Sequence, residues 1–206
     1  MLSGKKLRVA VLVSGGGTNL QAILDACADG TIRHAEPVLV VSNNPEAYAL
    51  TRARRAGVPA LVLCRRELGG QEGFERELDR VLRENRVDLI VLAGFMTILS
   101  KDFTERYEHR IINIHPSLIP SFCGKDYYGL RVHEAALARG VKLTGATVHY
   151  VNEIPDGGEI LLQKAVEVLP DDTPESLQRR VMEQAEWILL PRAIELIASK
   201  SICTEN

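Results

Sequence analysis

Three side chains of this sequence have the types and spacing to catalyse transfer of an acyl group. Asn113 and His115 lie two residues apart after a pair of isoleucines, and Asp156 follows about forty residues later in a Pro-Asp-Gly-Gly stretch. Residues i and i+2 of a strand point to the same face, so we expect the amide and the imidazole side by side where Pro116 ends the strand. A carboxylate beside the imidazole would raise its pKa from about 6.5 and orient the ring. Such a trio suits acyl transfer through a tetrahedral oxyanion.

Each of these residues alone is weak as a signal. His115 alone is more often a structural histidine, and Asp156 alone is ordinary turn chemistry. Their position in the predicted sheet changes this, because ligand sites of open α/β sheets lie outside the carboxyl ends of the strands. Residues 15–17 follow the first predicted strand, residues 94–96 follow the fourth, and residues 113–115 close the fifth. We therefore expect these segments to meet at one edge.

The glycine-rich loop of residues 14–18 favours binding of a phosphate. It joins a strand to a helix, where backbone N–H groups and the helix N-terminus attract anions. The dinucleotide fingerprint is only half met, because Leu20 stands where the third glycine belongs. A single phosphate is therefore favoured over a pyrophosphate, with Thr18 and Asn19 as additional donors. The alternative is that the glycines only make a tight turn.

Composition is typical of one globular domain over residues 1–206, with a frayed tail at 199–206. The chain has 46% hydrophobic residues and nearly balanced charge, 25 basic against 27 acidic, which does not favour binding to nucleic acid or an anionic membrane. The longest apolar runs are far short of the ~20 residues of a membrane span. No signal-peptide region precedes the first strand, and the four cysteines are widely spaced. A reduced, cytoplasmic protein without a metal site is expected.

Short apolar strands alternate with amphipathic helices along the first half of the chain. This predicts an α/β fold with a doubly wound, mostly parallel sheet of Rossmann type. A C-terminal antiparallel hairpin and a closing helix, with Thr173 as N-cap and Pro174 in its first turn, should complete it. Strands are expected at residues 7–13, 38–41, 58–63, 88–93 and 111–114, helices at 19–28, 46–56, 74–82 and 131–139, and the hairpin at 145–151 and 160–168.

Other reactive residues are weaker candidates. His34 and His109 have polar surroundings, and His149 lies in an alternating strand, which favours a structural role. His133 is expected on the solvated face of a helix. Cys123 has no nearby base, so it is not expected to be a nucleophile.

Together, the motifs at residues 14–20, 92–96, 113–118 and 156–158 closely resemble the phosphoribosylglycinamide formyltransferase family. The resemblance covers residues 7–198 and implies a formyltransferase-like fold. It also implies transfer of the formyl group of 10-formyltetrahydrofolate, a co-substrate, to the amine of glycinamide ribonucleotide. The products would be formylglycinamide ribonucleotide and tetrahydrofolate, in de novo purine (IMP) biosynthesis. The implied partners are these small molecules, without nucleic acid or membrane, and the chain would be a monomer or homodimer.

The resemblance also implies the residues of three sites. The catalytic residues would be Asn113, His115 and Asp156. The ribonucleotide would be bound by Gly17, Thr18, Asn19, Glu183 and Glu186. The folate would be bound by Met96, Thr97, Ile98, Leu99, Asn113, Asn152, Glu153, Ile154, Pro155 and Asp156.

The sequence departs from the family pattern in four places. Thr97 stands where many members have arginine, and Gln71 lies near the position of a folate-tail arginine, for which Arg65 or Arg66 could substitute. The loop of residues 121–132 is longer than in many relatives, with Tyr-Tyr-Gly inserted at 127–129. Glu186 is one residue late when counted from residues 180–181, which predicts a local bulge in the last helix.

The implied mechanism is direct attack of the amine on the formyl carbon. Asn113 and His115, as an imidazolium, would each donate a hydrogen bond to the oxyanion. Asp156 would keep the imidazolium charged and position a water that carries the proton to the leaving nitrogen.

Three other functions remain open. The nearest is formyltetrahydrofolate deformylase, although those enzymes usually carry an N-terminal regulatory domain. Methionyl-tRNA formyltransferase normally has a basic C-terminal domain, whereas this sequence shows no basic excess. A non-catalytic nucleotide-phosphate binding module would explain the glycine loop but not the catalytic trio.

Overall fold

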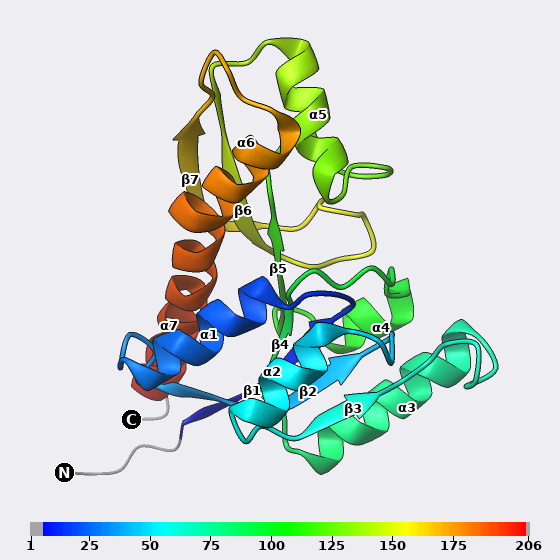
Figure 1. The fold of residues 1–206 in the computed structure, drawn as a ribbon. Coiled ribbons are helices and arrows are strands. Elements are labelled where there is room, and N and C mark those ends of the chain that lie inside the picture. The colour runs from blue at the N-terminus through cyan, green and yellow to red at the C-terminus, as the bar shows by residue number, and fades with distance from the viewer. Residues whose placement is uncertain (1–5, 205–206) are drawn as a thin grey trace.

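The computed structural model describes residues 6–204 and contains a seven-stranded sheet with the order β3-β2-β1-β4-β5-β6-β7 (Figure 1). The first five strands in the chain pair in parallel, whereas β6 pairs antiparallel with both β5 and β7. The predicted parallel sheet with an antiparallel hairpin at its edge is therefore confirmed. The strands are β1 Leu7–Val13, β2 Ala35–Ser42, β3 Ala60–Val62, β4 Leu89–Leu92, β5 Ile111–His115, β6 Leu143–Tyr150 and β7 Ile160–Glu167.

Helices connect the parallel strands and close the fold. One of them, α4, was not predicted, because a helix of six residues is too short to show an amphipathic period; Ser100 caps it by accepting a hydrogen bond from the N–H of Phe103. Figure 1 shows α6 running on into α7 as one helical segment, and the turn between them, η1, is π-helical. The helices are α1 Thr18–Ala28, α2 Tyr48–Arg55, α3 Gln71–Glu84, α4 Lys101–Arg106, α5 Leu130–Arg139, α6 Pro174–Val181, η1 Met182–Glu186 and α7 Trp187–Thr204.

The buried strand β1 separates two hydrophobic clusters. Val9, Val11 and Val13 belong to a cluster with residues of α1, α6 and α7, whereas Ala10 and Leu12 belong to one with residues of α3. Strands covered on both faces are apolar throughout, which explains why this one shows no polar alternation.

The structure shows where the C-terminal helical segment begins and where it ends. Thr173 accepts a hydrogen bond from the N–H of Ser176 and Pro174 follows it, so the predicted N-cap is confirmed. Residues 199–204, which were expected to lie in a frayed tail, belong to α7. The Ser199 hydroxyl bonds back to the carbonyl of Leu196, and buried Ala198 continues the packed face of the helix. Residues 205–206 lie outside the described part of the chain.

The order of the strands reverses between β1 and β4, and the loops that follow these two strands touch. The N–H of Met96 donates a hydrogen bond to Oγ of Ser14 at 2.8 Å. Open α/β sheets bind ligands at such a switch point. The predicted meeting of the glycine loop with the loop after the fourth strand is confirmed.

Candidate active site

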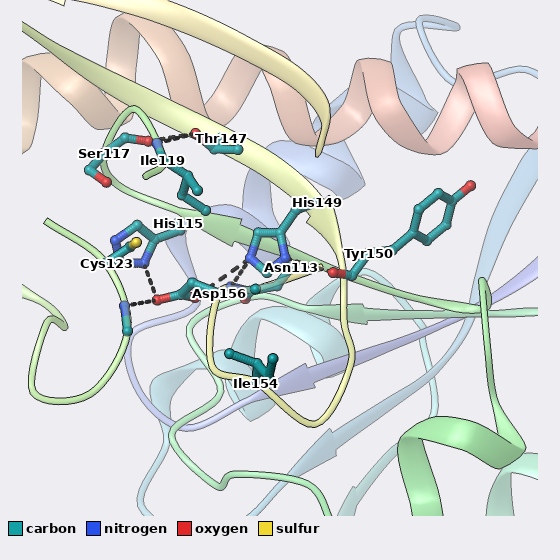
Figure 2. Close-up of polar contacts among 12 residues, drawn as sticks. Asn113, His115, Ser117, Ile119, Cys123, Thr147, His149, Tyr150, Ile154 and Asp156 are labelled. Carbon is teal, nitrogen blue, oxygen red and sulfur yellow. Dashed lines mark hydrogen bonds and ion pairs between the residues drawn. The ribbon is translucent and has the colours of Figure 1, made fainter. Parts of the chain in front are cut away.

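Asn113 and His115 at the end of β5 lie beside His149 of β6 and Asp156 of the loop after it (Figure 2). The antiparallel register pairs Asn113 directly with His149. Asp156 has a φ of 57°, a left-handed conformation uncommon for a residue other than glycine. Figure 2 shows its carboxylate between the two imidazole rings. The predicted trio therefore meets, and a second histidine joins it.

Both ring nitrogens of His115 have partners. Nε2 lies 2.8 Å from the carbonyl oxygen of Phe122, so it carries a hydrogen and donates it. Nδ1 lies 3.3 Å from Oδ2 of Asp156. Burial lowers the pKa of His115 below its ordinary value, although the Asp156 carboxylate and the Phe122 carbonyl act in the opposite sense. The expected resting imidazolium is therefore not supported, because desolvation outweighs the carboxylate.

His149 was expected to be only structural, yet it contacts two members of the trio. Nδ1 lies 2.7 Å from the carbonyl oxygen of Tyr150, so this nitrogen carries the hydrogen. Nε2 is then an acceptor, and it lies 3.1 Å from Nδ2 of Asn113. The same nitrogen lies 3.5 Å from Oδ1 of Asp156. Alternation identified the strand, but only its register places His149 opposite Asn113.

The carboxylate of Asp156 is partly buried and accepts a hydrogen bond from the backbone. Its Oδ2 accepts a hydrogen bond of 2.8 Å from the N–H of Gly124. Burial alone would raise the pKa of Asp156, but the contacts with His149, His115 and Gly124 outweigh it and lower the pKa below its ordinary value. Asp156 is therefore ionised at neutral pH. A Cβ at Gly158 would lie 1.8 Å from the Tyr150 carbonyl oxygen, so this turn requires glycine there.

A cleft of about 130 Å³ adjoins this cluster. Its lining includes every predicted folate residue except Met96, whose side chain is 55% exposed. His115 is not part of the lining, whereas Asn113 and Asp156 are. The residues that sequence reasoning did not single out for this cleft are Leu92, Phe95, His149 and Val151.

The predicted ribonucleotide residues come from α1 and η1. Gly17 precedes α1 with a φ of 72°, and a Cβ there would lie 2.6 Å from Cβ of Ala49, so the position requires glycine. Nδ2 of Asn19 donates to Oε2 of Glu186 at 2.7 Å. Glu186 is buried, which raises its pKa to about 7 despite the bond from Asn19. Glu183 is exposed.

The π-helical turn confirms the predicted bulge before Glu186. A π turn accommodates one extra residue within a helix and is often found at functional sites. Here it comprises Met182–Glu186 and brings the Glu186 carboxylate to Asn19 at the N-terminus of α1. In a regular α-helix, the side chain at this position would point in a different direction, rotated around the helix axis by the angle of one residue.

Two of the departures from the family pattern, Thr97 and Gln71, lie at the cleft: Thr97 lines it and Gln71 contacts Ile98 in its wall. Thr97 accepts a hydrogen bond from Nδ2 of Asn43 at 2.7 Å. Gln71 donates to the carbonyl of Ile98 at 3.0 Å, and Arg65 donates to Gln71 at 3.2 Å. The Arg65 guanidinium is thus held near Ile98, a cleft residue.

Among the other candidates, one prediction is wrong. His133 is fully buried rather than solvated, and burial together with the nearby His115 lowers its pKa to about 4. His34 and His109 are exposed, as expected. Burial, and the charge of Asp156, raise the pKa of the Cys123 thiol, which does not suit a nucleophile. Within residues 6–204, no group of three or more His, Cys, Asp or Glu side chains is arranged so that it could hold a metal ion.

No helix in the described part of the chain is long and apolar enough to cross a membrane.

The formyl transferase family matches residues 7–194. The phosphoribosylglycinamide formyltransferase of Haemophilus influenzae is 43% identical over 188 residues, which cover 91% of this chain and 85% of that protein. The structure of glycinamide ribonucleotide transformylase 1 from Symbiobacterium toebii has a TM-score of 0.88 and 42% identity, covering 96% of this chain and 93% of that one.

Longer relatives contain the same unit. The trifunctional purine biosynthetic protein adenosine-3 of Drosophila melanogaster is 46% identical over 200 residues, 97% of this chain. This chain spans only 14% of the length of that protein. The matches in sequence and structure agree with the geometry of the site, and the chain belongs to the formyl transferase family, among the phosphoribosylglycinamide formyltransferases.

Proposed function

We propose that this chain transfers the formyl group of 10-formyltetrahydrofolate to the amine of glycinamide ribonucleotide, in de novo purine biosynthesis. The observation that carries this proposal is the contact of Asn113 and Asp156 with His149 in the wall of the cleft. An amide donor and an ionised carboxylate face the same space there. One can stabilise an oxyanion and the other can direct a proton.

The ribonucleotide binds at the glycine loop. The first turn of α1 has no side-chain cap, which leaves its N–H groups available to the phosphate. Asn19 and Glu186 then face the sugar, whose hydroxyl groups suit a buried carboxyl of raised pKa. Gly17 allows the loop to pack on Ala49.

The folate binds in the cleft beside Asn113 and supplies the formyl carbon as an electrophile. Ile98 and Ile154 are exposed and line the cleft, so they offer apolar surface to a flat ring system. The lining also contains Asn113, whose amide nitrogen has a second hydrogen beyond the one shared with His149. That hydrogen is available to the formyl oxygen.

The chemical step needs no covalent bond to the protein. The amine attacks the formyl carbon, the carbon–N10 bond breaks, and one proton passes from the amine to N10. Neutral His115 accepts this proton at Nδ1 through a water beside Asp156, because Nε2 already donates to Phe122. The Asp156 carboxylate stabilises the resulting imidazolium until the proton reaches N10.

The protein is expected to act in the cytoplasm as a monomer or homodimer. Cys27, Cys64 and Cys123 are free, which suits a reducing compartment. Analytical ultracentrifugation across a range of protein concentrations distinguishes the two states.

An absorbance assay with a 10-formyl folate donor tests the proposed function. Release of deformylated folate only in the presence of glycinamide ribonucleotide is the expected result. Release without the ribonucleotide would identify a deformylase. A folded protein that is silent in both assays would favour a non-catalytic binding module.

A further inference from the structure

The loop between β5 and α5, residues 116–129, contacts both His115 and Asp156, and the function above does not use its Tyr127-Tyr128 pair, which the family resemblance implied to be inserted. We propose that Tyr127 and Phe122 are positioning residues that hold the segment Phe122–Gly124 against the catalytic pair. This inference rests on the proposed function, since it assigns the inserted residues a role in that same site.

Three consecutive residues of this loop bridge the catalytic pair. The carbonyl oxygen of Phe122 accepts the hydrogen on Nε2 of His115 at 2.8 Å. Two residues later, the N–H of Gly124 donates to Oδ2 of Asp156 at 2.8 Å. That oxygen also faces Nδ1 of His115. The segment therefore selects the ring nitrogen of His115 that carries the hydrogen and the direction in which the Asp156 carboxylate points.

The backbone of this segment is not in a conformation that it would adopt unaided. Phe122 has a φ of 50°, in the left-handed region, where a bulky residue is rare. Such a conformation is unfavourable and persists only when the surrounding structure holds it. Strained residues of this kind cluster at functional sites. An external support for Phe122 is therefore required.

Packing of the Phe122 and Tyr127 rings supplies that support. The Phe122 side chain is partly buried and packs against the hydrophobic core cluster that includes Ile114 and Ala146. The Tyr127 ring meets it edge-on, with ring centroids 6.3 Å apart and an interplanar angle of 63°. The backbone N–H of Tyr127 also donates to the carbonyl of Gly124 at 3.2 Å. Tyr127 thus braces both ends of the segment.

Loss of the Tyr127 ring should release the segment rather than unfold the protein. Tyr127 is 37% exposed, and truncation of such a side chain is compatible with folding. Without the brace, the Phe122 carbonyl no longer selects Nε2 of His115 as the donor. The Asp156 carboxylate loses its contact with Gly124, and its pKa rises. Binding of the ribonucleotide at α1 should be unaffected.

The test compares Tyr127→Ala with Tyr127→Phe and with Tyr128→Ala. Tyr128 is the matched control, because its ring packs on Arg131 rather than on Phe122. The centroid of the Tyr128 ring lies 5.0 Å from the guanidinium carbon. Each variant is assayed for kcat, for KM of the ribonucleotide and for the pH dependence of kcat. The tautomer of His115 is read from ¹⁵N-histidine NMR spectra without substrate.

The expected result is a kcat roughly 3- to 10-fold lower for Tyr127→Ala with unchanged KM, the size of one weakened hydrogen bond. In this variant the acidic limb of the pH dependence of kcat should move to higher pH, and His115 should populate both tautomers. Tyr127→Phe restores the wild-type values, since it keeps the ring, and Tyr128→Ala matches wild type.

A lower melting temperature for Tyr127→Ala with an unchanged kcat, pH profile and tautomer would overturn the proposal. Equal losses in Tyr127→Ala and Tyr128→Ala would also overturn it. If wild type transfers no formyl group but the tautomer still changes in Tyr127→Ala, the proposed function fails and the positioning by Tyr127 stands.

Discussion

Nε2 of His149 accepts a hydrogen bond from Nδ2 of Asn113 at 3.1 Å, and this contact determines which way the Asn113 amide faces. The orientation is set in two steps. The Tyr150 carbonyl oxygen, 2.7 Å from Nδ1 of His149, requires the hydrogen on that nitrogen. Nε2 is then an acceptor and binds the NH₂ group of Asn113 rather than its oxygen. The second amide hydrogen remains available to the cleft, which Asn113 lines. Figure 2 shows Asn113 beside the His149 ring.

Asn113→Ala should therefore lose most of the turnover. Removal of one oxyanion donor typically lowers kcat by about 10²- to 10³-fold. Affinity for glycinamide ribonucleotide should be unchanged, because Asn19 and Glu186 lie on other elements. Steady-state kinetics and titration calorimetry check the two halves of this prediction. A variant with near wild-type kcat would remove Asn113 from the chemical step.

His149→Leu should lower kcat by roughly 10-fold, because the amide of Asn113 is then free to rotate. The loss should largely disappear in an Asn113→Ala background, where no amide is left to orient. A double-mutant cycle measures this coupling. Fully additive losses would show that His149 acts independently of Asn113, for example through its contact with Asp156 alone.

The buried carboxyl of Glu186 should make stability depend on pH. Burial raises its pKa in the folded protein from 4.5 to about 7, so the folded state holds this proton more tightly than the unfolded state. Stability is then lost as the pH rises through this window. Glu186→Gln removes the titration and should gain stability over wild type between pH 4.5 and 7, reaching about 3 kcal/mol.

Urea unfolding of Glu186→Gln at several pH values tests this expectation. Glu183→Gln, at an exposed position of the same turn, is the control and should show no such trend. A stability difference between Glu186→Gln and wild type that does not vary between pH 4.5 and 7 would mean that Glu186 titrates normally.

His133 should affect stability in the opposite sense to Glu186, because it should lower the stability of the folded protein as the pH falls. Its pKa is lowered from 6.5 to about 4 by burial, so the unfolded state takes up the proton first as the pH falls. Stability is therefore lost between pH 6.5 and 4. His133→Leu should lose less stability than wild type over this range, by as much as about 3 kcal/mol.

Exposed His109 provides the control for this experiment, since His109→Leu should retain the wild-type acid dependence. Differential scanning calorimetry at pH 4, 5, 6 and 7 is sufficient. Parallel stability curves for His133→Leu and wild type would contradict the assignment. The Glu186 carboxyl partly offsets His133 in the wild type, so variants separate the two effects better than wild type alone.

The fold was predictable because its signals are local. Buried β1 and the capped start of α6 at Thr173 follow from apolar runs and cap chemistry, which act over a few residues. The parallel pairing of the first five strands followed from the alternation of strands with helices, whereas their order was not predicted. Helix α4 was missed because six residues carry no period, and the extent of α7 was missed because serines near its end bond back to the helix.

The site was predictable only in part. Asn113 and His115 share a strand, so their spacing places them on one face. His149 required the register between β5 and β6, which a single sequence does not contain. His133 was assigned to a solvated face, yet it packs inward with Val132 and Ala136. The pKa of His115 depends on burial by residues distant in the chain, so the expected rise in this pKa was wrong in sign.

Tracing a labelled formyl group distinguishes its transfer to the ribonucleotide from its hydrolysis to formate. Wild type and Asp156→Asn are incubated with 10-[¹⁴C]formyltetrahydrofolate and glycinamide ribonucleotide, and the label is separated into ribonucleotide and formate. Wild type should place the label in the ribonucleotide, whereas Asp156→Asn should bind the ribonucleotide but transfer little. Label that accumulates as formate, or full transfer by Asp156→Asn, would contradict these expectations.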